Sequence, residues 1–264
     1  MSASMPTSLF PPTSELQRVF GETVKALGAT SVRTYDDGVT LIARAVLAPS
    51  EEVRIGDRLH GGVAIRTSEH EILVHPMTFR LVCTNGAIRA HAEDTRIVSR
   101  VSLEETVAAA HSYALDGVIT ALVDAVRLCA SPRALRQGAH EMRSALAMDA
   151  ETAIERLELL SVVHTLPATP LGQALQRTLG RHLRALGHAA NRERSAFAFG
   201  NALTAAGRDA PHPELQWTLE EYGAAVFAAA DLGQRPPTAS HRSCIASIPP
   251  DANRFGIDGG PNRV

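Results

Sequence analysis

The sequence of 264 residues has few aromatic side chains, one lysine, three cysteines and no long apolar run. Without a stretch of about 18 apolar residues, no segment is predicted to cross a membrane. Cys83, Cys129 and Cys244 are too few and too scattered for a disulfide framework, which favours free thiols in a reducing compartment. Because the N-terminus also lacks the features of a signal peptide, we expect a cytoplasmic protein.

The basic side chains are unusual because 25 of the 26 are arginine, and Lys25 is the one lysine. The sequence therefore contains no Gly-Lys-[Ser/Thr] phosphate loop, and lysine chemistry would have to use Lys25, whose neighbours indicate no site. A formal net charge of −2 gives no global attraction to nucleic acid. Any such binding must come from a local patch.

The pattern along the chain predicts an α+β fold. Residues 1–12 form a flexible lead, and residues 13–101 form a mixed subdomain that begins with an amphipathic helix capped by Ser14. Strands over 31–35 and 39–47 are joined by Asp37-Gly38, a dipeptide suited to a tight hairpin. Shorter strands follow over 53–55, 62–66 and 71–74. Together they predict a twisted antiparallel β-meander that is covered on one face.

Residues 75–100 fit two structures. Pro76 at a first helical position and Asn85-Gly86 as a left-handed stop favour a short helix, which requires a positive φ at Gly86. The same Asn-Gly pair also fits a hairpin between two strands. The helix is our prediction, and the hairpin is the alternative.

Residues 102–232 are predicted to form a helical bundle, followed by a disordered tail over 233–264. Ser102 and Glu105 form a capping box, and Thr218 and Glu221 form another that opens the last helix, with Trp217 and Tyr222 as its hydrophobic staple. Further helices are predicted from Ser131-Pro132, after Asp149, from Thr169-Pro170 and over 192–206. One apolar seam with helical spacing consists of His111, Leu115, Val118, Leu122, Ala125 and Cys129.

Signatures of catalysis are absent: the sequence has no G-x-S-x-G, H-E-x-x-H, C-x-x-C or G-x-G-x-x-G. The histidines of one stretch, His60, His70, His75 and His91, match no standard metal spacing. We therefore predict no metal, no cofactor and no catalytic residue. An enzyme would have to use Cys83, His91 and Arg80.

One basic cluster stands out between residues 177 and 208, where six arginines accompany a single acid, Glu193. Three arginines and a histidine are spaced to share one helix face, and like charges at that spacing repel each other unless an anion lies between them. Guanidinium groups bind phosphate in a bidentate manner. The alternative is a solvated face opposite acids of the same fold. The predicted nucleic-acid-binding residues are Arg177, Arg181, Arg184, His188 and Arg192.

The segment Arg80-Leu-Val-Cys83-Thr-Asn85-Gly86, followed by His91, resembles the phage- and plasmid-like family called domain of unknown function 932. Phe199-Gly-Asn201-Ala-Leu-Thr204 is similar to the second recurrent motif of that family. The resemblance spans about residues 30–230 and implies a mobile-element context with no established activity. Arg80, Asn85 and His91 are expected to be structural first, with Arg80 bonded to backbone or a carboxylate near a sheet–helix junction.

Three functions compete on this basis. The first is a non-enzymatic nucleic-acid-binding protein, either a single-strand binding or annealing protein or one of DNA maintenance and recombination. The second is a protein-interaction or assembly subunit, in which the apolar seam would form an interface between copies. The third is an uncharacterised enzyme. The expected partners are single-stranded nucleic acid and further copies of this chain in a homo-oligomer, with no membrane.

Overall fold

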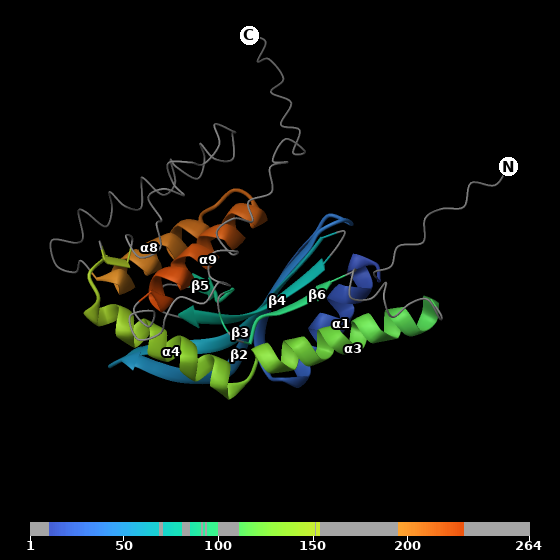
Figure 1. Ribbon diagram of the computed structural model, residues 1–264, viewed down its shortest axis with the longest axis horizontal. Coiled ribbons are helices and arrows are strands. Elements are labelled where there is room, and N and C mark those ends of the chain that lie inside the picture. Colours follow the sequence, from blue (N-terminus) through green and yellow to red (C-terminus); the bar gives the residue numbers. More distant parts are fainter. Residues whose placement is uncertain are drawn as a thin grey trace, which may run out of the picture.

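A computed structural model describes residues 11–68, 71–80, 85–90, 92, 94–99, 111–150, 152–153 and 195–229. These residues form an antiparallel sheet and five helices (Figure 1). The strands are β1 Ala29–Asp36, β2 Leu41–Arg54, β3 Asp57–Thr67, β4 Glu71–Arg80, β5 Asn85–Ile88 and β6 Arg96–Ser99. The helices are α1 Thr13–Ala26, α3 His111–Cys129, α4 Pro132–Ala147, α8 Ala196–Arg208 and α9 Pro213–Ala228. The α+β class and the N-terminal antiparallel strands are confirmed.

The six-stranded sheet has the order β1-β2-β3-β4-β5, and β6 pairs with β4 beside β5. Gly38 has a φ of 86° in the turn between β1 and β2, as the Asp37-Gly38 pair predicts. Gly56, with a φ of 78°, closes the next hairpin between Arg54 and Asp57. Residues 53–55, predicted as a separate strand, are instead the end of the long strand β2 and its turn.

The predicted helix within residues 75–100 is wrong, because this stretch holds β4, β5 and β6. Most of β4 is buried on both faces, so its apolar residues form a run without the period of a strand. The carbonyl of Pro76 accepts a hydrogen bond from the Arg89 N–H. The nitrogen of Pro76 points to the same side of β4, where the gap between β5 and β6 lies. Proline lacks an N–H, but no strand hydrogen bond is lost at this gap.

Gly86 does not have the predicted positive φ, which among the described glycines occurs at Gly28, Gly38 and Gly56. It lies inside β5, opposite Phe79. A Cβ atom at Gly86 would lie 3.4 Å from Met77 Sδ and 3.6 Å from Glu220 Oε1. These are ordinary van der Waals distances, so neither a left-handed turn nor a clash requires glycine at this position.

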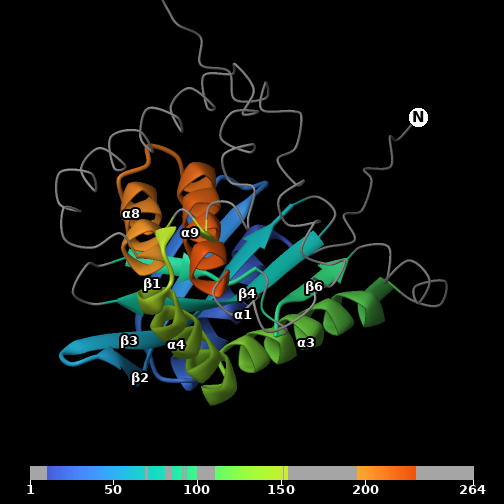
Figure 2. The ribbon, with the colours of Figure 1, turned by 60° about the vertical axis from the view of Figure 1, so that its left-hand side comes forward.

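Both faces of the sheet carry helices, not one face as predicted. Helices α1, α3 and α4 lie along one face, and α9 lies on the other with α8 beside it (Figures 1 and 2). The apolar seam of α3 packs against α1 and the sheet, and its described side chains Val118, Leu122, Ala125 and Cys129 are buried. These four side chains form part of the core of a single chain.

Helix boundaries follow some of the predicted caps. Ser131 caps α4, with its Oγ accepting from the Ala134 N–H, and Ser195 caps α8 in the same way. Helix α1 begins one residue before the predicted cap Ser14. The predicted cap of the last helix is wrong, because α9 begins at Pro213 and Thr218 lies inside it, donating to the Glu214 carbonyl.

The strands and the C-terminal helices share one hydrophobic cluster. Val53, Leu59 and Ala87 of the sheet pack with side chains of α4, α8 and α9. Whether residues 13–101 and 102–232 are separate subdomains stays a prediction. The predicted lead over 1–10, the capping box at Ser102, the helices predicted within 154–194 and the tail over 233–264 lie outside the described residues.

Close packing of α8 against α9 gives a first testable prediction. A Cβ at Gly223 would meet the Thr204 side chain and lie 2.8 Å from the Gly200 carbonyl oxygen, whereas nothing lies within 4 Å of one at Gly117. Gly223→Ala should lower the free energy of unfolding by about 1–3 kcal/mol through overpacking. Gly117→Ala on α3 should leave it unchanged or raise it by up to about 1 kcal/mol. Urea unfolding of both variants measures the difference, and equal effects would contradict the packing argument.

Candidate functional site

The two motifs that resemble the family meet in space. Arg80, at the end of β4, donates from Nη1 to Asn201 Oδ1 of α8 at 2.5 Å. Its Nε and Nη2 donate to the two carboxylate oxygens of Asp57, at 3.0 and 2.5 Å. The guanidinium carbon also lies 4.8 Å from the ring centroid of Phe197. The expectation that Arg80 bonds a carboxylate at a sheet–helix junction is confirmed.

The Arg80 cluster is buried, with Arg80 and Asp57 each 4% exposed. Every described polar contact of the guanidinium is with another residue of the chain, so the cluster is a structural junction. Asn85 pairs with Arg80 through the backbone of β5. Cys83 and His91 lie outside the described residues, as do all five predicted nucleic-acid-binding residues, Arg177, Arg181, Arg184, His188 and Arg192.

Three more arginines bind carboxylates across the interface between the sheet and the helices. Arg89 donates to both carboxylate oxygens of Glu141 on α4, at 3.0 and 2.8 Å, and to the Ala134 carbonyl. Arg44 lies 2.8 Å from Glu220 of α9, and Arg66 lies 3.0 Å from Glu214. The sequence shows no sign of these pairs, because their members are 52 to 176 residues apart.

A second group of arginines faces outward along α4. Arg133, Arg136, His140 and Arg143 are all exposed, and their spacing places them within one arc of the helix. We call these four residues the α4 stripe. The only acid of α4, Glu141, is buried against Arg89. Within the described part of the chain, neither Arg136 nor Arg143 is in an ion pair, although Arg143 donates to the Glu52 carbonyl at 2.8 Å.

Helix α4 runs beside the β2–β3 hairpin, which carries charges of both signs (Figure 2). Glu52 is exposed there, and Arg54 lies 3.4 Å from Asp57. Arg54 and Arg58 are exposed on either side of the turn, and Ile55 at its tip is fully exposed. Sequence reasoning missed the α4 stripe, although its spacing of three, four and three residues matches the rule that selected the arginines after residue 177.

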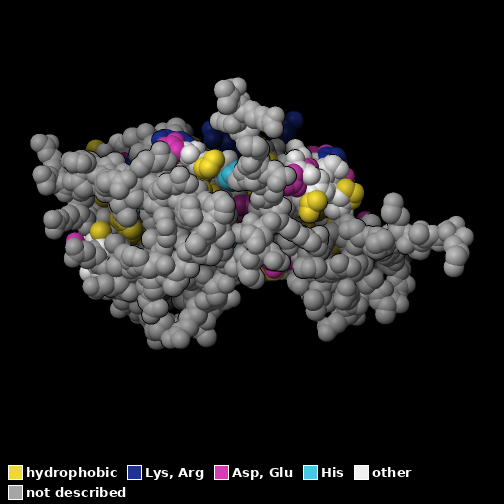
Figure 3. Space-filling model, turned by 90° about the horizontal axis from the view of Figure 1, so that it is seen from above, with side chains coloured by type: hydrophobic (Ala, Val, Ile, Leu, Met, Phe, Trp, Pro, Cys, Tyr) yellow, Lys and Arg dark blue, Asp and Glu magenta, His cyan; other side chains and the backbone are white. Residues whose placement is uncertain are grey.

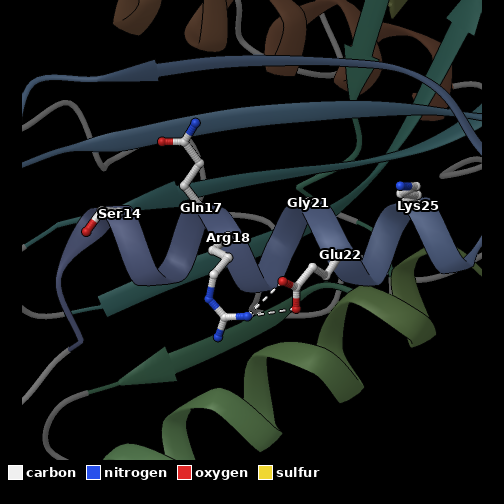
Figure 4. A pocket seen from close by; sticks show the side chains of 6 residues that line it. All are labelled: Ser14, Gln17, Arg18, Gly21, Glu22 and Lys25. Carbon is white, nitrogen blue, oxygen red and sulfur yellow. Dashed lines mark hydrogen bonds and ion pairs between the residues drawn. The ribbon is translucent and has the colours of Figure 1, made fainter.

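On the face seen from above, the described residues in view include basic, acidic and hydrophobic side chains close together (Figure 3). An open groove beside α1 is lined by Ser14, Gln17, Arg18, Gly21, Glu22 and Lys25 (Figure 4). Arg18 is held by Glu15 and Glu22 at 2.7 and 2.8 Å. Lys25 borders this groove, but the other residues that line it do not form a catalytic group with Lys25.

A cluster of titratable side chains lies between the sheet and α9. Glu221 accepts a hydrogen bond from Trp217 Nε1 at 2.7 Å and lies 4.0 Å from His75 Nε2. Burial raises the pKa of Glu221 to about 7, partly offset by the Trp217 hydrogen bond and by Arg66. Burial likewise raises the pKa values of Glu214 and Glu220. Perturbed acids of this kind occur at functional sites and also in structural networks.

Nucleophiles and metal ligands are sparse in the described part of the chain. The Cys129 thiol donates to the carbonyls of Asp94 and Val74, and burial raises its pKa to about 12, so it is unreactive. Among the described residues, no three His, Cys, Asp or Glu side chains gather closely enough to hold a metal ion. No described helix is long and apolar enough to span a membrane.

The Arg80 junction yields a second prediction, for stability. Arg80→Met removes the bidentate partner of the buried Asp57 carboxylate and leaves it only Arg54, at 3.4 Å, which should cost up to about 3–5 kcal/mol of unfolding free energy. Arg18→Met removes a pair of similar geometry that lies exposed on α1, and should cost less than about 1 kcal/mol. Chemical denaturation of the two variants measures both costs. A loss at Arg80 as small as that at Arg18 would contradict the structural role.

Glu221 yields a third prediction, for pH. Because its folded pKa lies above the ordinary value of 4.5, the folded protein holds a proton that the unfolded chain has released between about pH 4.5 and 7. This group therefore lowers stability as pH rises through that window, by at most about 3 kcal/mol. Glu221→Gln keeps an acceptor for Trp217 and should be increasingly more stable than the parent from pH 5 to 8. If the unfolding free energies of Glu221→Gln and of the parent changed equally with pH, the raised pKa of Glu221 would be contradicted.

Comparison with known proteins identifies no relative: no family model matches the sequence, and no curated protein or solved structure matches it. The resemblance to domain of unknown function 932 therefore stays a prediction.

Proposed function

We propose that this protein binds nucleic acid through backbone phosphates, and that the α4 stripe is a contact surface. The observation that carries the proposal is the exposed face of α4, which presents three arginines and a histidine and no acid. Guanidinium groups bind phosphate oxygens through two parallel hydrogen bonds. Nucleic acid is the polyanion that presents phosphates in a row.

The contrast between the interior arginines and two residues of the stripe, Arg136 and Arg143, supports this assignment. Arg44, Arg66, Arg80 and Arg89 each bind a carboxylate of the same chain. Arg136 and Arg143 form no ion pair within the described part of the chain, and like charges at the spacing of the stripe repel each other. From Arg133 to Arg143 the helix rises about 15 Å, a length that reaches several phosphates of a strand.

Binding of this kind is expected to be independent of base sequence. The large apolar side chains exposed in the described part of the chain are Val32, Tyr35, Val39, Ile55 and Ile97, and none lies on α4. Stacking of bases on aromatic rings is therefore not part of the α4 surface. Phosphate contacts alone position a protein on nucleic acid without reading bases.

The resemblance to a mobile-element family favours single-stranded DNA as the substrate, in annealing or DNA maintenance. The residues predicted from the sequence, Arg177, Arg181, Arg184, His188 and Arg192, would add a second phosphate-binding face. The proposal includes no enzymatic step.

The salt dependence of binding gives a fourth prediction. Each phosphate contact to a single strand contributes about 0.7 to the slope of log K against log salt concentration. Arg136→Gln and Arg143→Gln should each lower the magnitude of this slope by about 0.7 and weaken binding to all sequences alike. Fluorescence anisotropy with a labelled oligonucleotide at several salt concentrations measures both quantities.

Arg18→Gln is the matched control, because it removes the same charge from α1, where Glu15 and Glu22 already hold the arginine. Its slope should equal that of the parent. A separate triple variant, Arg177→Glu with Arg181→Glu and Arg184→Glu, tests the second face and should abolish binding to the oligonucleotide. If both α4 variants keep the parent's slope of log K against log salt concentration, the α4 stripe is not a contact surface. A parent protein that binds no oligonucleotide at low salt would contradict the whole proposal.

A further inference from the structure

Strand β1 is an open edge of the sheet. Every residue from Thr30 to Asp36 is exposed, and within the described part of the chain β1 pairs only with β2. Its outward N–H and C=O groups therefore have no strand partner there. The inner strands differ, because β2, β3 and β4 are largely buried.

Proteins protect such edges with proline, charged side chains (lysine above all), short strands, bulges or covering segments. Strand β1 is eight residues long, has neither proline nor lysine, and carries the charged residues Arg33 and Asp36. Its one irregularity lies at its start, between Ala29 and Ser31, which leaves the rest regular. Val32 and Tyr35 are 44% and 41% exposed, so the strand presents apolar surface on both faces of an open edge. An unprotected edge of this kind is a template for another strand.

We propose that β1 pairs with β1 of a second copy of this chain, antiparallel, with the two-fold axis at Thr34. A symmetric pair of this kind is self-complementary, so one strand supplies both sides of the contact. In this register Thr34 faces Thr34, and each Arg33 faces Tyr35 of the other copy. Threonine pairs and arginine–aromatic pairs both stabilise neighbouring strands.

Charge complementarity favours this register over its neighbour. A shift that centres the axis on Arg33 would place two guanidinium groups directly opposite each other, which is unfavourable. With the axis at Thr34, the two Arg33 side chains lie on a diagonal, farther apart than directly opposite residues, and Asp37 of the other copy lies on the other diagonal of each Arg33. Asp37 stays ionised there, because hydrogen bonds from the Thr40 and Val39 N–H groups lower its pKa. Its carboxylate already accepts from Tyr35 Oη at 3.4 Å.

The paired residues 32–36 also lie clear of the irregularity at the start of β1. Helix α1 approaches the strand from one face only, with Gln17 Nε2 donating to Thr34 Oγ1 at 3.4 Å. The two six-stranded sheets would then continue into one another across the axis. This dimer does not depend on nucleic-acid binding.

The test is the oligomeric state in solution, measured by sedimentation equilibrium and by light scattering after size exclusion. Experiments at about 0.5 M salt keep nucleic acid from linking copies. The parent should be a concentration-dependent dimer. Thr34→Lys and Thr34→Glu should each weaken dimerisation at least tenfold, because like charges meet at the axis. An equimolar mixture of the two variants should form a heterodimer.

Thr120→Lys is the control, because it makes the same substitution at an exposed threonine of α3, a helix that packs against α1, β4 and β6, and it should remain dimeric. Thermal unfolding of each variant should match the parent, since the substitutions lie on the surface. A parent that is monomeric at all concentrations would overturn the proposal. So would a Thr34→Lys variant that dimerises like the parent, or a mixture of the two charged variants that stays monomeric.

Discussion

Buried arginine–carboxylate pairs are the interaction on which the arrangement of this protein depends. Arg80 joins β3, β4 and α8 through Asp57 and Asn201, and Arg89 joins the sheet to α4 through Glu141. Removing charges from water offsets most of the attraction of such pairs, so their net stabilisation is small. Their geometry is strict, however, because a fork of N–H groups must meet two oxygens. We infer that they select one position for α4, α8 and α9 in a protein with few aromatic side chains.

The same requirement separates the arginines by role. A guanidinium inside the protein needs a carboxylate beside it, and the four interior arginines each have one. The one acid of α4, Glu141, is buried against Arg89, so the charged side chains on the outer face of the helix are all basic. The positive surface of α4 thus follows from the Arg89–Glu141 pair that joins the helix to the sheet.

The sequence predicts those features that depend on a few neighbouring residues. Asp37-Gly38 fixes a hairpin, and Ser131-Pro132 opens a helix, because turn and cap geometry is local. The stretch holding β4 was predicted as a helix because a strand buried on both faces has no alternation to read. Thr218 and Glu221 satisfy the pattern of a cap within a helix that Pro213 had already begun. For the candidate site, spacing alone cannot separate an outward arginine such as Arg136 from an inward one such as Arg89.

Trp217 is the single tryptophan of the chain and is fully buried between α9 and the sheet. Its ring lies 5.6 Å from that of His75 and 5.7 Å from the Arg44 guanidinium, and its N–H is bound to Glu221. Intrinsic tryptophan fluorescence of this protein therefore comes from one place, beside the His75 ring and the Glu221 carboxylate. Separation of α9 from the sheet would change that emission even where the circular dichroism of helices and strands did not. The molecule thus carries its own optical probe of the contact between its sheet and its last described helix.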